Sequence, residues 1–150
     1  MKPMAKVLLA SVLTMVVAVM LPALVLNIVG WKEIAGAGFL GAMCCFLAGS
    51  MGSVRTAFVL VLPLAVASGL AVAVAHNAWF AAVLMAIVAG GRGVSAALGL
   101  SGPLTMAPIS VGFLLAQPPD PRAGNPAWLS VGLIVFACAL FATLVVYLMR

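Results

Sequence analysis

The stretch VLLASVLTMVVAVMLPALVLNIV, residues 7–29, decides the class of fold, because it contains no charged residue. A helix needs about 20 mostly apolar residues to cross the hydrocarbon core of a bilayer. A cleaved signal peptide has a shorter apolar region and a small-residue exit site. This run is longer and ends in the polar turn Gly30-Trp31-Lys32-Glu33. It therefore predicts a membrane-spanning helix that is retained as a signal anchor.

The rest of the chain has the same character. Of its 150 residues 67% are hydrophobic and 6% are charged, and the mean hydropathy is +1.37. A soluble domain carries about 25% charged residues, and one of this size could not bury so much apolar surface. The composition indicates an integral membrane protein. It excludes a soluble enzyme, a nucleic-acid-binding domain and a disordered regulator.

Five more apolar segments follow the first, which predicts an all-α fold: one domain, residues 1–150, with a bundle of six transmembrane helices. The predicted spans are 7–29, 34–51, 56–75, 78–98, 99–116 and 127–149. Up to Gly91 the fourth span would be only about 21 Å long at 1.5 Å per residue. The fourth helix therefore either continues past Arg92 to about Leu98 or is broken there. The loop QPPDPRAGNP, residues 117–126, precedes the last span.

The basic residues predict the orientation of these spans. If the N-terminus is cytoplasmic, the inner side carries Lys2, Lys6, Arg55, Arg92 and Arg150 and no acid. The outer side then carries only Lys32 and Arg122, each near an acid. Cytoplasmic loops of membrane proteins are enriched in Lys and Arg, and tryptophan favours the interfaces. The outer ends hold all three tryptophans, Trp31, Trp79 and Trp128. We expect a multi-pass protein of the inner (plasma) membrane with both termini in the cytoplasm.

The residues that usually carry chemistry in membrane proteins are scarce here. Both acids, Glu33 and Asp120, lie outside the predicted spans, so no interior carboxylate can relay protons as in many coupled carriers. The single histidine, His76, lies at the end of a span. The three cysteines have no metal-ligand spacing. We therefore expect no catalytic residues, no metal site, no cofactor and no enzymatic activity.

The second span carries small residues at every fourth position: Ala37, Gly41, Cys45 and Gly49. Residues four apart lie on one face of a helix. In membranes, a row of small side chains allows close approach of a second helix. Gly41, Cys45 and Gly49 are therefore candidate helix-packing residues. The row serves either packing within the bundle or self-association.

The fifth span contains two prolines, Pro103 and Pro108. Each lacks an N–H and clashes with the carbonyl four residues earlier, and lipid offers no replacement hydrogen bond. Broken helices of this kind form binding sites in many transporters. Candidate hydroxyls for such a site are Ser101, Thr105 and Ser110. The alternative is an ordinary proline kink.

Arg55 and Arg92 are the remaining candidates for substrate binding. Both lie at predicted inner helix ends, where an arginine can simply anchor the topology. Arg92 is flanked by Gly91 and Gly93 beside the short fourth span. A guanidinium with open backbone around it suits a carboxylate, which it can bind through two hydrogen bonds.

Three segments together carry a family resemblance. They are AGSMGSVRTAF (48–58), HNAWFAAVL (76–84) and AGGRGVSAALG (89–99). From about Gly36 to Gln117 the chain resembles the membrane half of the fusaric-acid-resistance-type proteins, in the aromatic acid exporter superfamily. The resemblance implies a six-helix unit that exports aromatic carboxylates or related amphiphiles. It implies functional roles for Arg55 with Gly49 and Gly52, and for Arg92 with Gly90, Gly91 and Gly93.

The resemblance also implies partners. Such proteins usually continue into a cytosolic domain and often a second membrane half, whereas this sequence ends at Arg150. We expect a fragment, a split half or a minimal relative that forms homo-oligomers in the lipid bilayer and binds a small organic anion. The alternative is a structural or accessory membrane subunit without a substrate. Half of a major-facilitator-type carrier is disfavoured, because the loop at 50–55 has one arginine and no acid.

Overall fold

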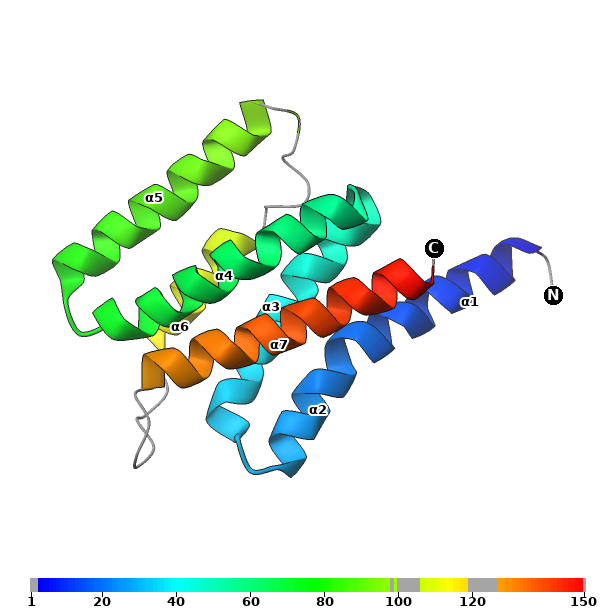
Figure 1. The fold of residues 1–150 in the computed structure, drawn as a ribbon, viewed down its shortest axis with the longest axis horizontal. Coiled ribbons are helices and arrows are strands. Elements are labelled where there is room, and N and C mark those ends of the chain that lie inside the picture. Colours follow the sequence, from blue (N-terminus) through cyan, green and yellow to red (C-terminus); the bar gives the residue numbers. More distant parts are fainter. Residues whose placement is uncertain (1–2, 98, 100–105, 119–126, 150) are drawn as a thin grey trace.

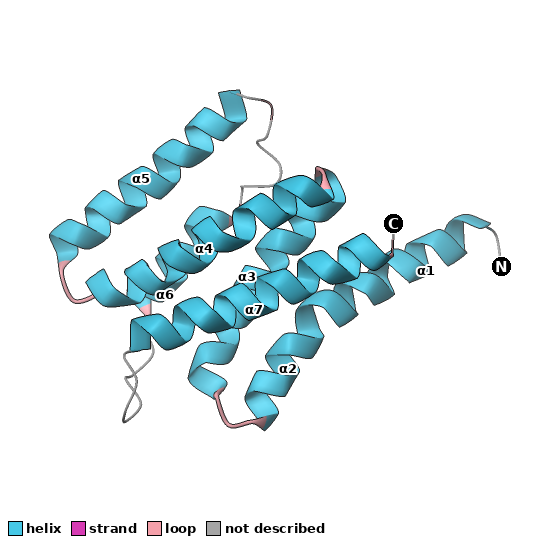
Figure 2. Cartoon of the chain, viewed as in Figure 1, coloured by secondary structure: helices cyan, strands magenta, loops and turns pink. Residues whose placement is uncertain are grey.

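The computed structural model describes residues 3–97, 99, 106–118 and 127–149, with the side chains of residues 3–8 and 33 also left out. The described residues form helices joined by short turns, with no strand among them (Figure 2). Five of the helical segments are long and apolar enough to cross a membrane. They are Leu9–Ile28, Ile34–Met51, Val54–Val74, Ala78–Ala97 and Ala127–Leu148. The described chain is thus a helical protein with the character of a multi-pass membrane protein.

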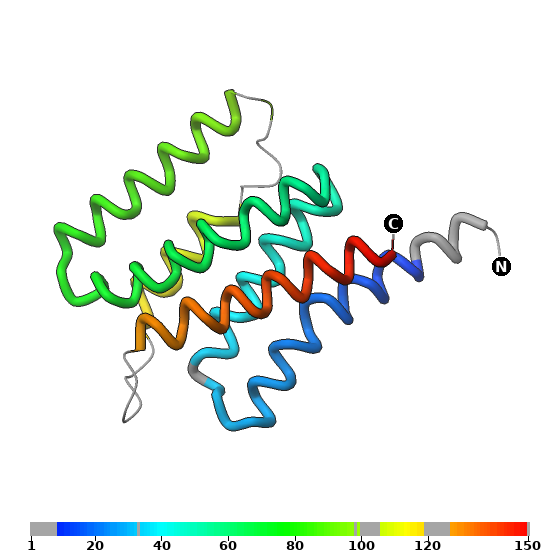
Figure 3. Tube along the Cα trace, viewed as in Figure 1, coloured from blue at the N-terminus to red at the C-terminus, as the bar shows by residue number. Residues whose placement is uncertain are grey.

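The first span is a single helix with a π-helical turn in it. It consists of α1 (Pro3–Met15), η1 (Val16–Met20) and α2 (Leu21–Ile28). Pro22 has no N–H to donate to the carbonyl of Ala18, and the π turn directly precedes this gap in the hydrogen-bond ladder. The helix changes direction at this turn, as the trace of residues 9–28 shows (Figure 3).

Short capping motifs set the ends of the next helices. After α2, Gly30 adopts a positive φ of 86°, and the N–H of Trp31 donates to the carbonyl of Leu26 at 2.8 Å. This bond closes a glycine-dependent helix end of the Schellman type. Helix α3 (Lys32–Met51) then begins. Helix α4 (Val54–Val74) begins after Ser53, whose hydroxyl accepts from the N–H of Thr56 at 3.1 Å.

Helix α5 (Ala78–Ala97) is continuous, so the fourth predicted span does extend past Arg92. Helix α6 (Ala107–Ala116) is much shorter than the predicted fifth span, 99–116. Gly99 and Met106 lie in turns, and residues 100–105 lie outside the described part of the chain. Helix α7 (Ala127–Leu148) is the last of the described elements.

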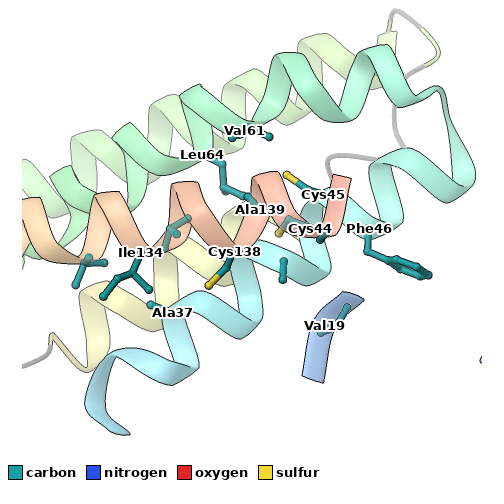
Figure 4. Close-up of a cluster of buried hydrophobic side chains, with 14 of the residues drawn as sticks. Val19, Ala37, Cys44, Cys45, Phe46, Val61, Leu64, Ile134, Cys138 and Ala139 are labelled. Atoms are coloured by element: carbon teal, nitrogen blue, oxygen red, sulfur yellow. The ribbon is translucent and has the colours of Figure 1, made fainter. Parts of the chain in front are cut away.

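The core lies where α7 packs against both α3 and α4 (Figure 1). Figure 4 shows Cys45 of α3, Leu64 of α4 and Ala139 of α7 gathered in this core. Helix α5 lies to one side and contacts only α4 and α6 substantially. The C-terminal end of α7 lies beside α1 (Figure 1). There the thioether sulfur of Met149 accepts a hydrogen bond from the Thr14 hydroxyl at 2.9 Å. The bundle therefore combines a dense three-helix centre with a loosely packed flank.

Candidate functional site

A cavity of about 220 Å³ lies between α4, α5 and α6, with one wall from α3. Its lining is almost entirely apolar and includes Leu64, Val88 and Val111. The one charged residue in the lining is Arg92 of α5. A cavity of this composition fits a small apolar molecule, and Arg92 is the one lining residue whose side chain carries a charge that could pair with an anionic group.

The position of Arg92 follows from the unbroken course of α5. The helix continues for five residues beyond Arg92, to Ala97. At 1.5 Å per residue this places Arg92 about 7 Å from the helix end along its axis. Ser95, one turn later, donates from its hydroxyl to the backbone carbonyl of Arg92 at 2.8 Å. Among the described residues the guanidinium forms no ion pair. Within the described part of the chain Arg92 is thus a cation without an ion-pair partner, and a charge inside an apolar helix makes it a candidate for a functional residue.

The opposite wall of the cavity contains Pro63, which the sequence analysis did not single out. Pro63 lies in the interior of α4 and lines the cavity. It has no N–H to pair with the carbonyl of Val59, so the backbone of α4 has an open acceptor near this level. A proline in the middle of the third predicted span was the signal that could have identified it. Cys44 of α3 also lines the cavity and is a free thiol.

Arg55 does not join this site. It lies in the first turn of α4, where its side chain is exposed, and it is not part of the cavity lining. The two arginines that the sequence analysis paired as substrate-binding candidates are therefore in different settings. Both arginines are exposed, but Arg92 lines the apolar cavity, whereas Arg55 lies at a helix end away from it.

The hydroxyls and prolines predicted for the broken fifth span fall partly outside the described residues. Ser101, Pro103 and Thr105 belong to that undescribed part. Pro108 lies in the first turn of α6, where its missing N–H costs no helical hydrogen bond. It therefore begins a helix and does not interrupt one. Ser110 is fully buried in α6 and is not in the cavity lining.

Two buried hydroxyls, those of Ser68 and Ser110, have no hydrogen-bond partner among the described residues. Both side chains are 0% exposed. A buried hydroxyl without a partner costs about 1–3 kcal/mol, so each is a polar position in an otherwise apolar interior. Ser68 was not identified from the sequence, because one serine in an apolar span is common in membrane helices.

The row of small residues on α3 faces α7. A Cβ atom built on Gly41 would lie 2.8 Å from Cγ1 of Val135, and one on Gly49 would lie 3.0 Å from Cγ1 of Val146. Cys45 lies in the same buried row, and its thiol donates weakly to the carbonyl of Ala57 at 4.0 Å. Helix α7 of the same chain thus covers this face, and a second copy has no access to it in this arrangement.

A second close helix crossing was not predicted. A Cβ atom on Gly69 of α4 would lie 2.9 Å from the backbone oxygen of Trp128, and one on Gly132 of α7 would lie 3.3 Å from the oxygen of Ala65. Two backbones approach this closely only where side chains are absent. The pair Gly69 and Gly132 therefore fixes the distance between α4 and α7.

No group of three or more His, Cys, Asp or Glu residues that could hold a metal ion occurs among the described residues. Comparisons of the chain with models of protein families, with curated proteins and with solved structures give no match. The site therefore has to be interpreted from its own chemistry, which is an apolar cavity with one arginine in its wall.

Proposed function

We propose that this chain is a membrane-embedded transport unit for an organic anion with an apolar, aromatic body. The observation that carries the proposal is the presence of Arg92 in the wall of an apolar cavity. An aromatic carboxylate would place its ring against Leu64, Val88 and Val111 and its carboxylate on the guanidinium. At about 220 Å³ the cavity is smaller than a typical ligand pocket of about 300–1,000 Å³, which limits the ligand to about one or two rings.

The proposal includes a topology. Six spans, with the short α6 as the core of the fifth, would place both termini on the cytoplasmic side of the inner membrane. The support is the excess of basic residues at that end and the tryptophans at the other. Trp31, Trp79 and Trp128 are all exposed and lie at the starts of α3, α5 and α7. The resemblance to aromatic acid exporters supports the same assignment, with a second copy or a second membrane half completing the pathway.

Ligand binding by the purified chain in lipid nanodiscs tests the proposal. The probes are 1-naphthoate and its neutral isostere 1-naphthamide. We expect the carboxylate to bind more tightly, and Arg92→Gln to weaken it about tenfold or more, because a hydrogen bond to a charged group contributes about 1.5–3 kcal/mol. The matched control is Arg55→Gln, which removes the same charge outside the cavity and should leave binding unchanged.

Two results would overturn the proposed site. One is equal binding of the carboxylate and the amide. The other is an equal loss of affinity in the Arg55 and Arg92 variants, which would indicate a general effect of net charge. Flux of labelled naphthoate from proteoliposomes then separates transport from binding. Binding without flux in any oligomeric state would contradict a transport role.

A structural or accessory membrane subunit is the second candidate, and the exposed side of α5 favours it. One stripe of that side consists of alanines and glycines, and it lies beside the exposed large side chains of Val83, Ile87 and Val94. The small residues of the stripe are Ala82, Ala86, Ala89, Gly90, Gly93 and Ala97. Cβ atoms built on Gly90 and Gly93 would have nothing within 4 Å. Such a face suits another membrane helix. If this candidate is right, the chain extracted from host membranes is part of a larger complex, and Ala86→Leu should dissociate that complex. Naphthoate binding should then be absent in every variant.

A further inference from the structure

A second hollow lies at the opposite side of the bundle, between the first span and α3. Its volume is about 560 Å³. The first span contributes one face, with Met20, Leu24 and Asn27, and α3 contributes Lys32 and Phe39. This α2–α3 cleft shares none of its lining residues with the cavity at Arg92, so it does not depend on the function proposed above.

The cleft has a polar end and an apolar end. Helices α2 and α3 are antiparallel and joined by the turn at residues 29–31, so Asn27 lies near Lys32 at the closed end of the hairpin. Met20 and Phe39 lie further along the two helices. From Met20 to Asn27 the helix rises about 10 Å at 1.5 Å per residue. The cleft is therefore long enough for part of an acyl chain, with polar groups at one end only.

The polar end has unused hydrogen-bonding capacity. Within the described part of the chain, neither the Asn27 amide nor the Lys32 ammonium has a hydrogen-bond or ion-pair partner. Both side chains are exposed, and the exposed Trp31 lies between them in sequence. An ammonium and an amide at the level of an interfacial tryptophan complement a phosphate at the headgroup level.

The shape of the first span keeps the cleft open. No residue of α2 is buried, although the helix is wholly apolar apart from Asn27. The change of direction at the π turn leaves α2 in contact with α3 along one side only. The apolar part of the cleft, including Leu24, consequently faces the region where the chains of the surrounding lipids lie.

We infer that the α2–α3 cleft binds one phospholipid with an anionic headgroup. Its phosphate contacts Lys32 and Asn27, and one acyl chain lies along Leu24, Phe39 and Met20. The charge of Lys32 selects an anionic lipid over a zwitterionic one of the same chain length. The apolar part of the cleft holds the chain whatever the headgroup.

Native mass spectrometry of the full chain, delipidated and then titrated with lipid, tests this assignment. The probes are phosphatidylglycerol and phosphatidylcholine with identical acyl chains. We expect the first adduct to favour phosphatidylglycerol about fivefold, as one lysine near an anionic lipid provides. Lys32→Gln should reduce that ratio to about one, and Lys32→Arg should preserve it. Ala23→Phe, which fills the cleft, should weaken both lipids.

Three outcomes would overturn the assignment. The first is an unchanged preference in Lys32→Gln. The second is an equal loss in Arg55→Gln, the matched control at the other end of the bundle. The third is displacement of the adduct by millimolar inorganic phosphate, which would indicate an anion site without a role for the acyl chain. An unchanged melting temperature without added lipid shows that each variant is folded. Naphthoate binding should persist in Lys32→Gln, which separates this site from the cavity at Arg92.

Discussion

Helices α3 and α5 have similar compositions and opposite surroundings. Both are rich in alanine and glycine, and both carry a glycine-containing segment near the same end of the bundle, AGSMG at 48–52 and AGGRG at 89–93. In α3 a Cβ atom on Gly41 would collide with α7, whereas in α5 a Cβ atom on Gly90 would meet nothing within 4 Å. Small residues thus allow close packing without ensuring it, and only a partner helix gives a glycine its structural role.

The contrast explains why the proposed sites lie at the margins. In the dense part α7 fills the space beside α3 and α4, and side chains such as Val135 and Ala139 are fully buried. Helix α5 has only Ser95 buried and leaves a cavity beside Arg92. Regions with few buried contacts are also where local opening is least costly. Under the proposed function, a ligand would enter beside α5 without separating the core helices.

The largest expected effect is at the α4–α7 crossing. We expect Gly69→Ala to destabilise the protein by about 1–3 kcal/mol, because the new methyl group would lie 2.9 Å from the backbone oxygen of Trp128, which cannot rotate away. Thermal unfolding in detergent, followed by circular dichroism, measures the change. Gly112→Ala is the matched control, since its nearest neighbour would be the flexible end of Met85 at 3.7 Å. An equal loss in both variants would contradict the close crossing.

A somewhat smaller loss is expected in the α3–α7 contact. Gly41→Ala places a methyl group 2.8 Å from Cγ1 of Val135, and the branched side chain of valine has little freedom to move. We expect a destabilisation of about 1–2 kcal/mol. The double variant with Val135→Ala should recover part of this loss, because it removes the colliding atom. If the double variant is no better than the sum of the two single variants, α7 does not cover Gly41.

A change of opposite sign is expected at Ser68. This hydroxyl is fully buried in the dense region without a described partner, so Ser68→Ala should stabilise the protein by up to about 1 kcal/mol. Ser53→Ala is the contrasting variant, because it removes the cap of α4 and should cost about 1 kcal/mol. Melting temperatures of the two variants, measured under the same conditions, show whether each substitution raises or lowers the stability. A lower melting temperature for Ser68→Ala would show that its hydroxyl has a partner in the membrane.

The smallest expected effect is on the open face of α5. Gly90→Ala adds a methyl group in open space and improves helix propensity, so we expect a gain of less than about 1 kcal/mol. The measurement is the same thermal unfolding, repeated in nanodiscs at several protein concentrations. A loss as large as that of Gly41→Ala would remove the distinction between the two helices. It would show that another chain covers α5 in the bilayer.

The sequence predicted the helices well and their neighbours poorly. Apolar length located five spans to within a few residues, and local signals such as Ser53 and Gly30 account for their ends. The beginning of α6 could also have been predicted from the sequence, since a proline such as Pro108 favours the first turn of a helix. The predicted span, 99–116, included this proline as a candidate helix break, and the prediction for Pro103 lies outside the described residues.

Helix pairing could not be predicted from the same pattern. In a membrane the lipid-facing and interior faces are both apolar, so hydrophobic periodicity does not show that Gly41 faces Val135 or that Gly90 faces open space. The cavity was only half predicted for a related reason. Arg92 was identified by its charge, whereas Pro63 and Val111 belong to the site through the packing of α4 against α6.

The contact between α3 and α7 has a consequence for how the protein is made. Chains enter the membrane from the N-terminal end during synthesis, and α7 is produced after the other described helices. The face of α3 that carries Gly41 and Gly49 therefore stays uncovered, and accessible to lipid or to a chaperone, until residues 127–148 have been translated. The first span, by comparison, buries little of its surface within the described chain. The centre of the bundle, by contrast, is complete only once α7 has packed against α3 and α4.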